Sequence, residues 1–275
     1  MSILFKNSNY HRHPAFGQML EISLCCYVKG LELGHKDIYI EWQDTRFLWS
    51  DKGTCVGGFK IPNSERLPFK FVSREESLIV DETIDIGKPN SLYEGCESII
   101  TQTGCRVNPC QIYIKEYIDK YGEIPKIIIK SSNSYKPFIL LHFRNSPKTN
   151  QQIGNINFES YLNIIRYIKR NNKFEIYKIG EQSRLDAYCD KIYNYFLNDI
   201  SLYFELVDNC SLYIGPPSGP WIVPIYFRKP IIALIKDNYV YEREMRGIGK
   251  ILTDNQKMLL VKDNYKKIKE IINTL

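Results

Sequence analysis

Short apolar runs alternate with amphipathic segments through the second half of the chain. The runs at 138–143, 211–215 and 230–235 are almost entirely apolar, and a similar but more polar run occupies 175–180. Continuous apolar runs of this length are typical of strands that are buried on both faces of a parallel sheet.

Helical spacing marks the segments between these runs. Residues 157–172 carry apolar side chains every three or four positions from Phe158 to Ile168, and Asn157 is a suitable N-cap. The same reasoning predicts helices at 184–198, 202–210 and 264–275, and another that begins near Pro220. Strands that alternate with helices predict a doubly wound α/β domain with right-handed crossovers.

The first half is less regular. Its pattern predicts strands at 3–5, 37–42 and 125–130 and helices at 16–34 and 109–122, whereas the stretch from 43 to 104 is rich in loop-forming residues. The polar, turn-forming segment 131–137 (SSNSYKP) is a candidate linker. We therefore expect two Rossmann-like α/β domains, at 1–133 and 138–275, the first of which is abbreviated.

Composition and charge narrow the class of protein. The 275 residues are 44% hydrophobic and 25% charged, and the formal net charge is +6. These values fit a soluble globular chain with an anionic small ligand or a membrane surface as partner, and they do not favour nucleic acid. The N-terminus does not read as a signal peptide and no apolar stretch is long enough to span a membrane, so we expect a cytoplasmic protein.

The eight cysteines include no C-x-x-C pair, which argues against a zinc ribbon or a thioredoxin-type site. Cys96, Cys105 and Cys110 could form a disulfide or a metal cluster. Scattered free thiols in a reducing compartment are the simpler interpretation.

Three candidate sites follow predicted strands of the second half, where open α/β sheets bind their ligands. His142 and Arg144 end the first strand, and an arginine presents a fork of donors that matches phosphate oxygens. Gly180 and Glu181 end the second, where a carboxylate could accept hydrogen bonds from a ribose or a base. Each residue also has an ordinary structural interpretation, as a surface ion pair or a core histidine.

The third site is the turn Gly-Pro-Pro-Ser-Gly-Pro at 215–220. Ser218 supplies a hydroxyl, and a helix that begins near Pro220 would supply free backbone N–H groups and a partial positive charge. The turn is therefore suited to an anion, most simply a phosphate, although such a sequence can also be a tight turn or an N-cap.

Residues 206–234 resemble the nucleotide-sugar-binding half of GT-B-fold glycosyltransferases, especially the heptosyltransferase-like group. That group has a Gly-x-x-Ser/Thr-Gly-Pro turn followed by Lys-Pro before the next strand. The matching residues are Gly215, Ser218, Gly219, Pro220, Lys229 and Pro230. The segment 142–144 (HFR) is similar to the His-x-Arg motif of fucosyltransferase-like GT-B enzymes, and 16–34 looks like the glycine loop and first helix that face the cleft.

The resemblance implies a glycosyltransferase of polysaccharide biosynthesis that moves a sugar from a nucleotide-diphosphate donor to a glycan or lipid-linked glycan. The 20 tyrosines and the basic charge also suit peripheral contact with a membrane that carries a lipid-linked acceptor. Donor diphosphate binding falls to Arg144, His142, Ser218, Gly219 and Gly17. The second domain would hold the donor and the first the acceptor. Neither family's donor sugar carries over, because Trp221–Val223 replaces a heptosyltransferase histidine and Asn145-Ser146 follows the arginine.

The general base would come from the first domain, where His11, His13 and Glu21 are the candidates. No Asp-x-Asp motif is present, which fits a site that needs no metal or other cofactor. Two alternatives stay open: a polysaccharide pyruvyltransferase or epimerase-like enzyme on the same scaffold, and a non-catalytic nucleotide-sugar-binding module.

Overall fold

The computed structural model describes residues 1–6, 16–42, 46–48, 55–58, 61, 63–86, 99–100, 106–107, 109–130, 133–144, 156–171, 173–193, 200–260 and 265–275. The chain forms two compact units, Met1–Lys130 and Ser131–Leu275. No helix within these ranges is long and apolar enough to cross a membrane.

The first unit is built on a four-stranded parallel sheet with the order β5-β2-β1-β6. Its strands are β1 (Ser2–Lys6), β2 (Asp37–Glu41), β5 (Lys70–Val72) and β6 (Glu82–Asp85). The helices are α1 (Phe16–Glu32) and α2 (Pro109–Tyr121). Two short antiparallel pairs add β3 (Arg46–Leu48) with β4 (Cys55–Gly58), and β7 (Ile99–Ile100) with β8 (Arg106–Val107).

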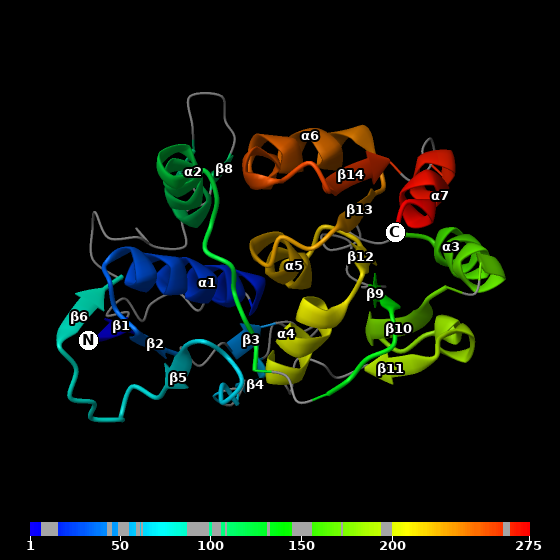
Figure 1. Cartoon of the computed structure of the whole chain (residues 1–275). Coiled ribbons are helices and arrows are strands. Elements are labelled where there is room, and N and C mark those ends of the chain that lie inside the picture. Colours follow the sequence, from blue (N-terminus) through cyan, green and yellow to red (C-terminus); the bar gives the residue numbers. More distant parts are fainter. Residues whose placement is uncertain are drawn as a thin grey trace. The chain divides into compact units, whose positions relative to one another are not determined.

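The second unit contains a six-stranded parallel sheet with the order β11-β10-β9-β12-β13-β14 (Figure 1). Its strands are β9 (Phe138–Phe143), β10 (Glu175–Gly180), β11 (Lys191–Tyr193), β12 (Leu212–Gly215), β13 (Ile231–Ile235) and β14 (Gln256–Leu260). Counted along the chain, this is the order 3-2-1-4-5-6, so the direction of winding reverses between β9 and β12.

Helices cover both faces of this sheet. They are α3 (Phe158–Asn171), α4 (Ile200–Asn209), α5 (Ile222–Tyr226), α6 (Asn238–Arg246) and α7 (Tyr265–Asn273), with 3₁₀ turns η2 (Arg184–Tyr188), η4 (Gly219–Trp221) and η5 (Ile248–Ile251). Ile139, Leu141 and Phe143 of β9 pack in one core cluster with α3 and α7. Because side chains alternate along a strand, Phe138, Leu140 and His142 face the opposite side, where α4 and α5 lie (Figure 1).

The buried strands predicted for the second half are confirmed, as are its predicted helices other than the one at 184–198. Asn157 caps α3, since its side-chain oxygen accepts a hydrogen bond from the backbone N–H of Ser160 at 2.7 Å. All four residues of β12 and all six of β9 are buried, as their continuous apolar sequence indicates.

The helix predicted at 184–198 is wrong for residues 184–193, and residues 194–198 lie outside the described residues. After the short turn η2 the backbone becomes extended at Cys189, and Asp190 binds the second strand twice. Its N–H donates to the Ile176 carbonyl and its carboxylate accepts from the Ile176 N–H, each at 2.8 Å. These bonds place β11 beside β10, so Ile192 and Tyr193 belong to an edge strand.

The strand predicted at 125–130 is also wrong. Ile127 and Ile129 are buried whereas Ile128 is 65% exposed, so the segment alternates as an extended chain does. It joins no sheet, although the Lys130 N–H donates to the Arg66 carbonyl at 3.1 Å. Alternation alone did not distinguish an extended surface segment from a paired strand.

The first described residues of the second unit are fastened to α4. The Asn133 amide and the Tyr135 hydroxyl donate to the carboxylate of Glu205, at 2.6 Å and 3.0 Å, and Glu205 is fully buried. A buried carboxylate is stable only with such donors. The polar segment predicted as a linker is therefore tied to the second unit from Asn133 onward.

Candidate functional site

The carboxyl ends of β9 and β12 form the switch point of the six-stranded sheet, where the connections on either side run to opposite faces. In open α/β sheets a crevice opens at this point and ligands bind there. His142 lies at the end of β9, and Gly215 ends β12. The sequence motifs singled out in the second half therefore gather at the place where a ligand is expected.

His142 is buried, and its surroundings hold it neutral. Burial lowers the pKa of the imidazole to about 3, with the charges of Arg144 and Lys178 acting in the same direction. Its Nδ1 atom lies 2.9 Å from the Tyr213 hydroxyl and 3.4 Å from the Ser218 hydroxyl. At neutral pH His142 offers a hydrogen bond rather than a positive charge.

Two glycines let neighbouring strands close around His142. A Cβ atom on Gly215 would lie 2.7 Å from the His142 Cβ atom. Gly180 has φ +103°, and a Cβ atom there would lie 2.1 Å from the Phe143 carbonyl oxygen. Any larger residue would push the ends of β10 and β12 away from β9, so both glycines shape this edge of the sheet.

Arg144 supplies the positive charge next to this histidine. It is partly buried, and burial lowers the pKa of its guanidinium while the carboxylate of Glu181 opposes that shift. Glu181 is itself exposed, and its N–H donates to the Phe143 carbonyl at 3.1 Å. A partly desolvated arginine beside an exposed carboxylate can exchange that partner for a phosphate.

Ser218 stands at the start of η4, and its backbone is extended with φ −146°. Its hydroxyl makes no cap to the turn, whereas its carbonyl accepts from the Trp221 N–H at 2.9 Å. The helix predicted after Pro220 is confirmed but short, because α5 spans only Ile222–Tyr226. A helix of this length contributes little dipole, so the hydroxyl and local N–H groups are the more useful donors here.

A cavity of about 890 Å³ opens on the α3 and α7 side of the same edge. Its described lining comes from the ends of three strands and from these two helices: Phe143, Ile156, Asn157, Phe158, Ser160, Asn163, Ile164, Gln182, Ser183, Arg184, Lys236, Tyr265 and Ile268. Among the lining residues that the structure describes, Arg184 and Lys236 are charged and none is a carboxylate. The Arg184 guanidinium lies 5.6 Å from the centre of the Phe158 ring, and Phe143 adds a further aromatic surface.

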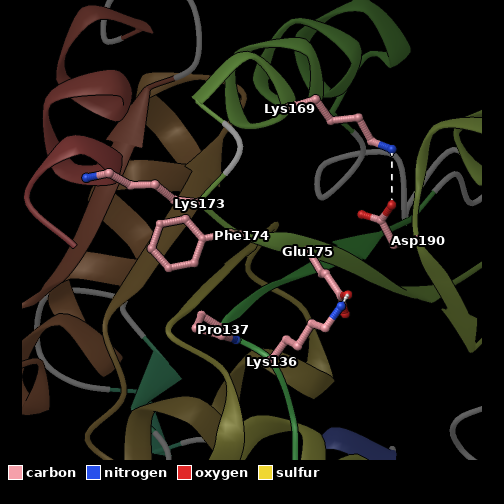
Figure 2. Close-up of a pocket in the computed structure, with 7 residues that line it drawn as sticks. All are labelled: Lys136, Pro137, Lys169, Lys173, Phe174, Glu175 and Asp190. Atoms are coloured by element: carbon pink, nitrogen blue, oxygen red, sulfur yellow. Dashed lines mark hydrogen bonds and ion pairs between the residues drawn. The ribbon is translucent and has the colours of Figure 1, made fainter.

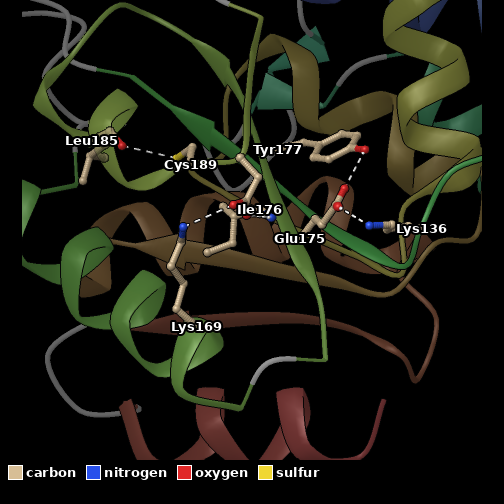
Figure 3. A network of polar contacts seen from close by, with 8 residues as sticks. Lys136, Lys169, Glu175, Ile176, Tyr177, Leu185 and Cys189 are labelled. Atoms are coloured by element: carbon tan, nitrogen blue, oxygen red, sulfur yellow. Dashed lines mark hydrogen bonds and ion pairs between the residues drawn. The ribbon is translucent and has the colours of Figure 1, made fainter.

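A second pocket of about 410 Å³ lies at the opposite, amino-terminal edge of the sheet (Figure 2). Here both carboxylates have a lysine partner. Lys136 pairs with Glu175 at 3.6 Å, and Lys169 pairs with Asp190 at 3.2 Å (Figures 2 and 3). Figure 3 shows Glu175 between Lys136 and the Tyr177 hydroxyl, from which it also accepts a hydrogen bond. The Asp190 carboxylate accepts from the N–H of Ile176, which links the start of β11 to β10.

The first unit holds the remaining predicted residues. Gly17 lies within the first turn of α1, and Glu21 lies on the same helix with its side chain 5% exposed. His11 and His13 lie outside the described residues. Cys25, Cys26 and Cys110 are buried, and burial raises the pKa of Cys25 and Cys26, which makes these two thiols poor nucleophiles.

Sequence reasoning missed the cavity and one buried charge. Asn157 was identified only as a cap, and Arg184 and Lys236 lie far apart in the chain with no motif around them. Lys178 reads as an ordinary polar position of a strand, yet its side chain is 1% exposed. Among the residues that the structure describes, no cluster of three or more His, Cys, Asp or Glu side chains could hold a metal ion.

No protein-family model matches the sequence, and no curated protein matches it significantly. Solved structures do match. The ADP-heptose LPS heptosyltransferase II of E. coli is 10% identical with a TM-score of 0.53, and the match covers 100% of this chain and 98% of that one. The glycosyl transferase family 9 protein of Veillonella parvula DSM 2008 is 11% identical with a TM-score of 0.53, over 100% and 97% of the two chains.

The iron-containing dodecameric glycosyltransferase TibC of enterotoxigenic E. coli H10407 matches at 13% identity and a TM-score of 0.45. That match covers 85% of this chain, which spans only 57% of the TibC chain. The two full-length matches carry the structural conclusion. The chain has the GT-B type of fold, with two Rossmann-like α/β units of which the first is abbreviated, as the sequence predicted.

Proposed function

We propose that this protein is a glycosyltransferase that moves a sugar from a nucleotide-diphosphate-sugar donor to a glycan or glycolipid acceptor without a metal ion. One observation carries the proposal. The switch-point edge of the second sheet combines Arg144 and the Ser218 turn with a cavity of about 890 Å³ whose described lining holds two cations and no carboxylate. The fold agrees, since the matching E. coli structure is named an ADP-heptose heptosyltransferase.

The chemistry of sugar transfer explains these residues. When the bond between sugar and diphosphate breaks, negative charge builds up on the leaving diphosphate. Arg144 would neutralise that charge with a charge-assisted hydrogen bond, and the Ser218 hydroxyl and Gly219 N–H would add donors. Arg144 is partly desolvated, which strengthens its attraction for an anion.

The cavity would take the nucleoside end of the donor. Its volume lies in the range of ordinary small-molecule sites. Phe143 and the Arg184–Phe158 pair present flat surfaces to a base, and Asn157, Ser183 and neighbouring amides present hydrogen-bonding groups to a ribose. Gly180 and Glu181, the residues predicted for the nucleoside, immediately precede this wall.

The first unit would then bind the acceptor. The base that activates the acceptor hydroxyl would be His11, His13 or Glu21. Glu21 is 5% exposed, and its carboxylate would serve as the base by accepting the proton of the acceptor hydroxyl.

A thermal-shift screen tests the proposal. Wild type and Arg144→Ala are heated with UDP, GDP, CDP, ADP, CMP and their sugars in the presence of EDTA. At a concentration of about 100 times its Kd, a bound nucleotide stabilises the fold by about 2.7 kcal/mol. We expect one nucleotide class to raise the Tm of wild type and to lose that effect with Arg144→Ala. If no nucleotide shifts the wild type, the transferase function is wrong.

A non-catalytic nucleotide-sugar-binding module is the second candidate. It is favoured by one observation, namely that Glu21, the one candidate base within the described residues, is buried. Binding of a nucleotide sugar without release of its nucleoside diphosphate, measured with a panel of glycan acceptors, would support this alternative over the transferase.

A further inference from the structure

We propose that Lys178 and Asp186 form a positioning pair that holds the segment 181–186 in place as one wall of the donor cavity. The inference rests on the proposed function, since it assigns the pair to the nucleoside end of that site. Neither residue touches the cavity, so the pair acts through the residues between its two anchor points.

The geometry of the pair is that of a clamp. The Lys178 ammonium donates to the Glu181 carbonyl at 2.6 Å and lies 2.9 Å from the Asp186 carboxylate. Both acceptors belong to the segment that follows β10, one at its beginning and one near its end. A single side chain on the strand therefore fixes two points of the segment.

The residues between these points are the ones that face the cavity. Gln182, Ser183 and Arg184 all line it. Ser183 is fixed further, because its hydroxyl accepts from the Leu185 N–H at 3.2 Å and lies 3.4 Å from the Asp186 carboxylate. If the clamp were released, this wall and the Arg184 guanidinium would lose their fixed position.

Burial of the Lys178 ammonium at this position costs free energy. Its side chain is 1% exposed, and Ile176, two residues earlier on the same face of β10, belongs to the hydrophobic core. Burying an ion pair costs desolvation energy that the pairing often fails to recover, and apolar replacements of a buried pair are often neutral or stabilising. Stability of the fold alone would be served by an apolar pair, so the charges point to a role in holding the segment.

The test separates stability from positioning. The double variant Lys178→Met with Asp186→Leu removes both charges and leaves no unpaired ion. Lys169→Met is the matched control, because it removes the lysine of an exposed Lys–Asp pair from the other edge of the same sheet. Each protein is titrated with UDP, GDP, CDP and ADP and with inorganic pyrophosphate, which has no nucleoside.

We expect the double variant to keep its fold while its Kd for the nucleoside diphosphate that wild type binds rises about tenfold or more. Its Kd for pyrophosphate should change by less than about twofold, because Arg144 and the Ser218 turn are untouched. Lys169→Met should resemble wild type with every probe. A double variant that binds nucleoside diphosphates as wild type does would overturn the positioning role.

Hydrogen exchange of the ligand-free protein gives a second readout. Backbone amides in 181–186 should exchange about tenfold faster or more in the double variant, while those of β9 and β12 keep their protection. Unchanged exchange in 181–186 overturns the clamp even if nucleotides bind. If instead wild type binds neither nucleotides nor pyrophosphate, the proposed function fails and the assignment of the pair to a donor site fails with it.

The single variant Asp186→Asn covers the case in which the double variant does not fold. It keeps the shape and an oxygen acceptor but removes one charge. We expect an increase of about threefold in the nucleoside diphosphate Kd with little change for pyrophosphate. Equal weakening of both probes would indicate a general loss of structure and would contradict the positioning role.

Discussion

The pockets at the two edges of the six-stranded sheet differ in the charges that line them. At the amino-terminal edge, Glu175 pairs with Lys136 ahead of β9, and Asp190 pairs with Lys169 of α3. At the carboxyl-terminal edge, Arg184 and Lys236 line a cavity whose described residues include no carboxylate. The charged residues described at the first pocket have both signs, whereas those described at the second are all positive, a distribution that would suit an anionic ligand.

Burial differs in the same way. Lys136 is 82% exposed and its pair with Glu175 is well screened by water, so such a pair contributes about 0–1 kcal/mol. His142 and Lys178 at the other edge are almost fully buried, and there a charge or hydrogen bond has a much larger effect. The edge where burial of polar side chains costs more free energy is therefore the edge that carries the candidate ligand site.

The largest effect should come from Gly180→Ala. Both the positive φ and the 2.1 Å approach to the Phe143 carbonyl oppose a Cβ atom, so we expect a loss of about 3 kcal/mol or more in the free energy of unfolding. Urea unfolding measures this loss. Gly34→Ala is the control for φ alone. Gly34 has φ +83°, but a Cβ atom added there would meet no other part of the protein within 4 Å, so the free energy of unfolding should fall by only about 1 kcal/mol.

The next effect concerns acid. Because the pKa of His142 falls from 6.5 to about 3 on folding, its contribution to stability is fully present above pH 6.5 and is lost as the pH falls towards 3. Between pH 7 and 5 the loss should be about 2 kcal/mol. The free energy of unfolding of His142→Gln should fall by about 2 kcal/mol less than that of wild type between pH 7 and pH 5. Parallel curves for the two proteins would show that His142 is not held neutral.

A third experiment removes two positive charges from one edge or from the other. The pair Arg184→Ala with Lys236→Ala removes the cations of the cavity, and Lys136→Ala with Lys169→Ala removes the same number from the other edge. We expect the first to raise the Kd of the bound nucleotide about tenfold and the second to leave it within about twofold. If isothermal titration showed the same change in the nucleotide Kd for both double variants, the two edges would not differ in ligand binding.

The smallest effect should be that of Glu175→Gln. It breaks an exposed pair with Lys136, so the free energy of unfolding should fall by less than about 1 kcal/mol. Nucleotide binding should not change. A loss of several kcal/mol in chemical denaturation would mean that the amino-terminal edge is as demanding as the other.

The sequence predicted what depends on local pattern. Continuous apolar runs identified β9, β12 and β13, and the spacing with Asn157 identified α3. The order of the motifs along the chain placed His142, Arg144 and Ser218 at strand ends. These features follow from residues that are close in sequence, so they can be read without coordinates.

What the sequence did not predict depends on distant contacts. The edge strand β11 forms because Asp190 binds Ile176, and nothing in its own residues distinguishes it from a helix. The cavity combines residues from Phe143 to Ile268. The neutrality of His142 and the clamp by Lys178 arise from burial, which composition and spacing do not reveal.

The bonds from Asn133 and Tyr135 to Glu205 bear on how such a unit could be exchanged between proteins. Recombination that cut the chain just before Phe138 would separate a fully buried carboxylate from two of its donors. A crossover ahead of Asn133 would carry those donors along. A transplanted second unit would therefore keep both donors of Glu205 only if its fragment began ahead of Asn133.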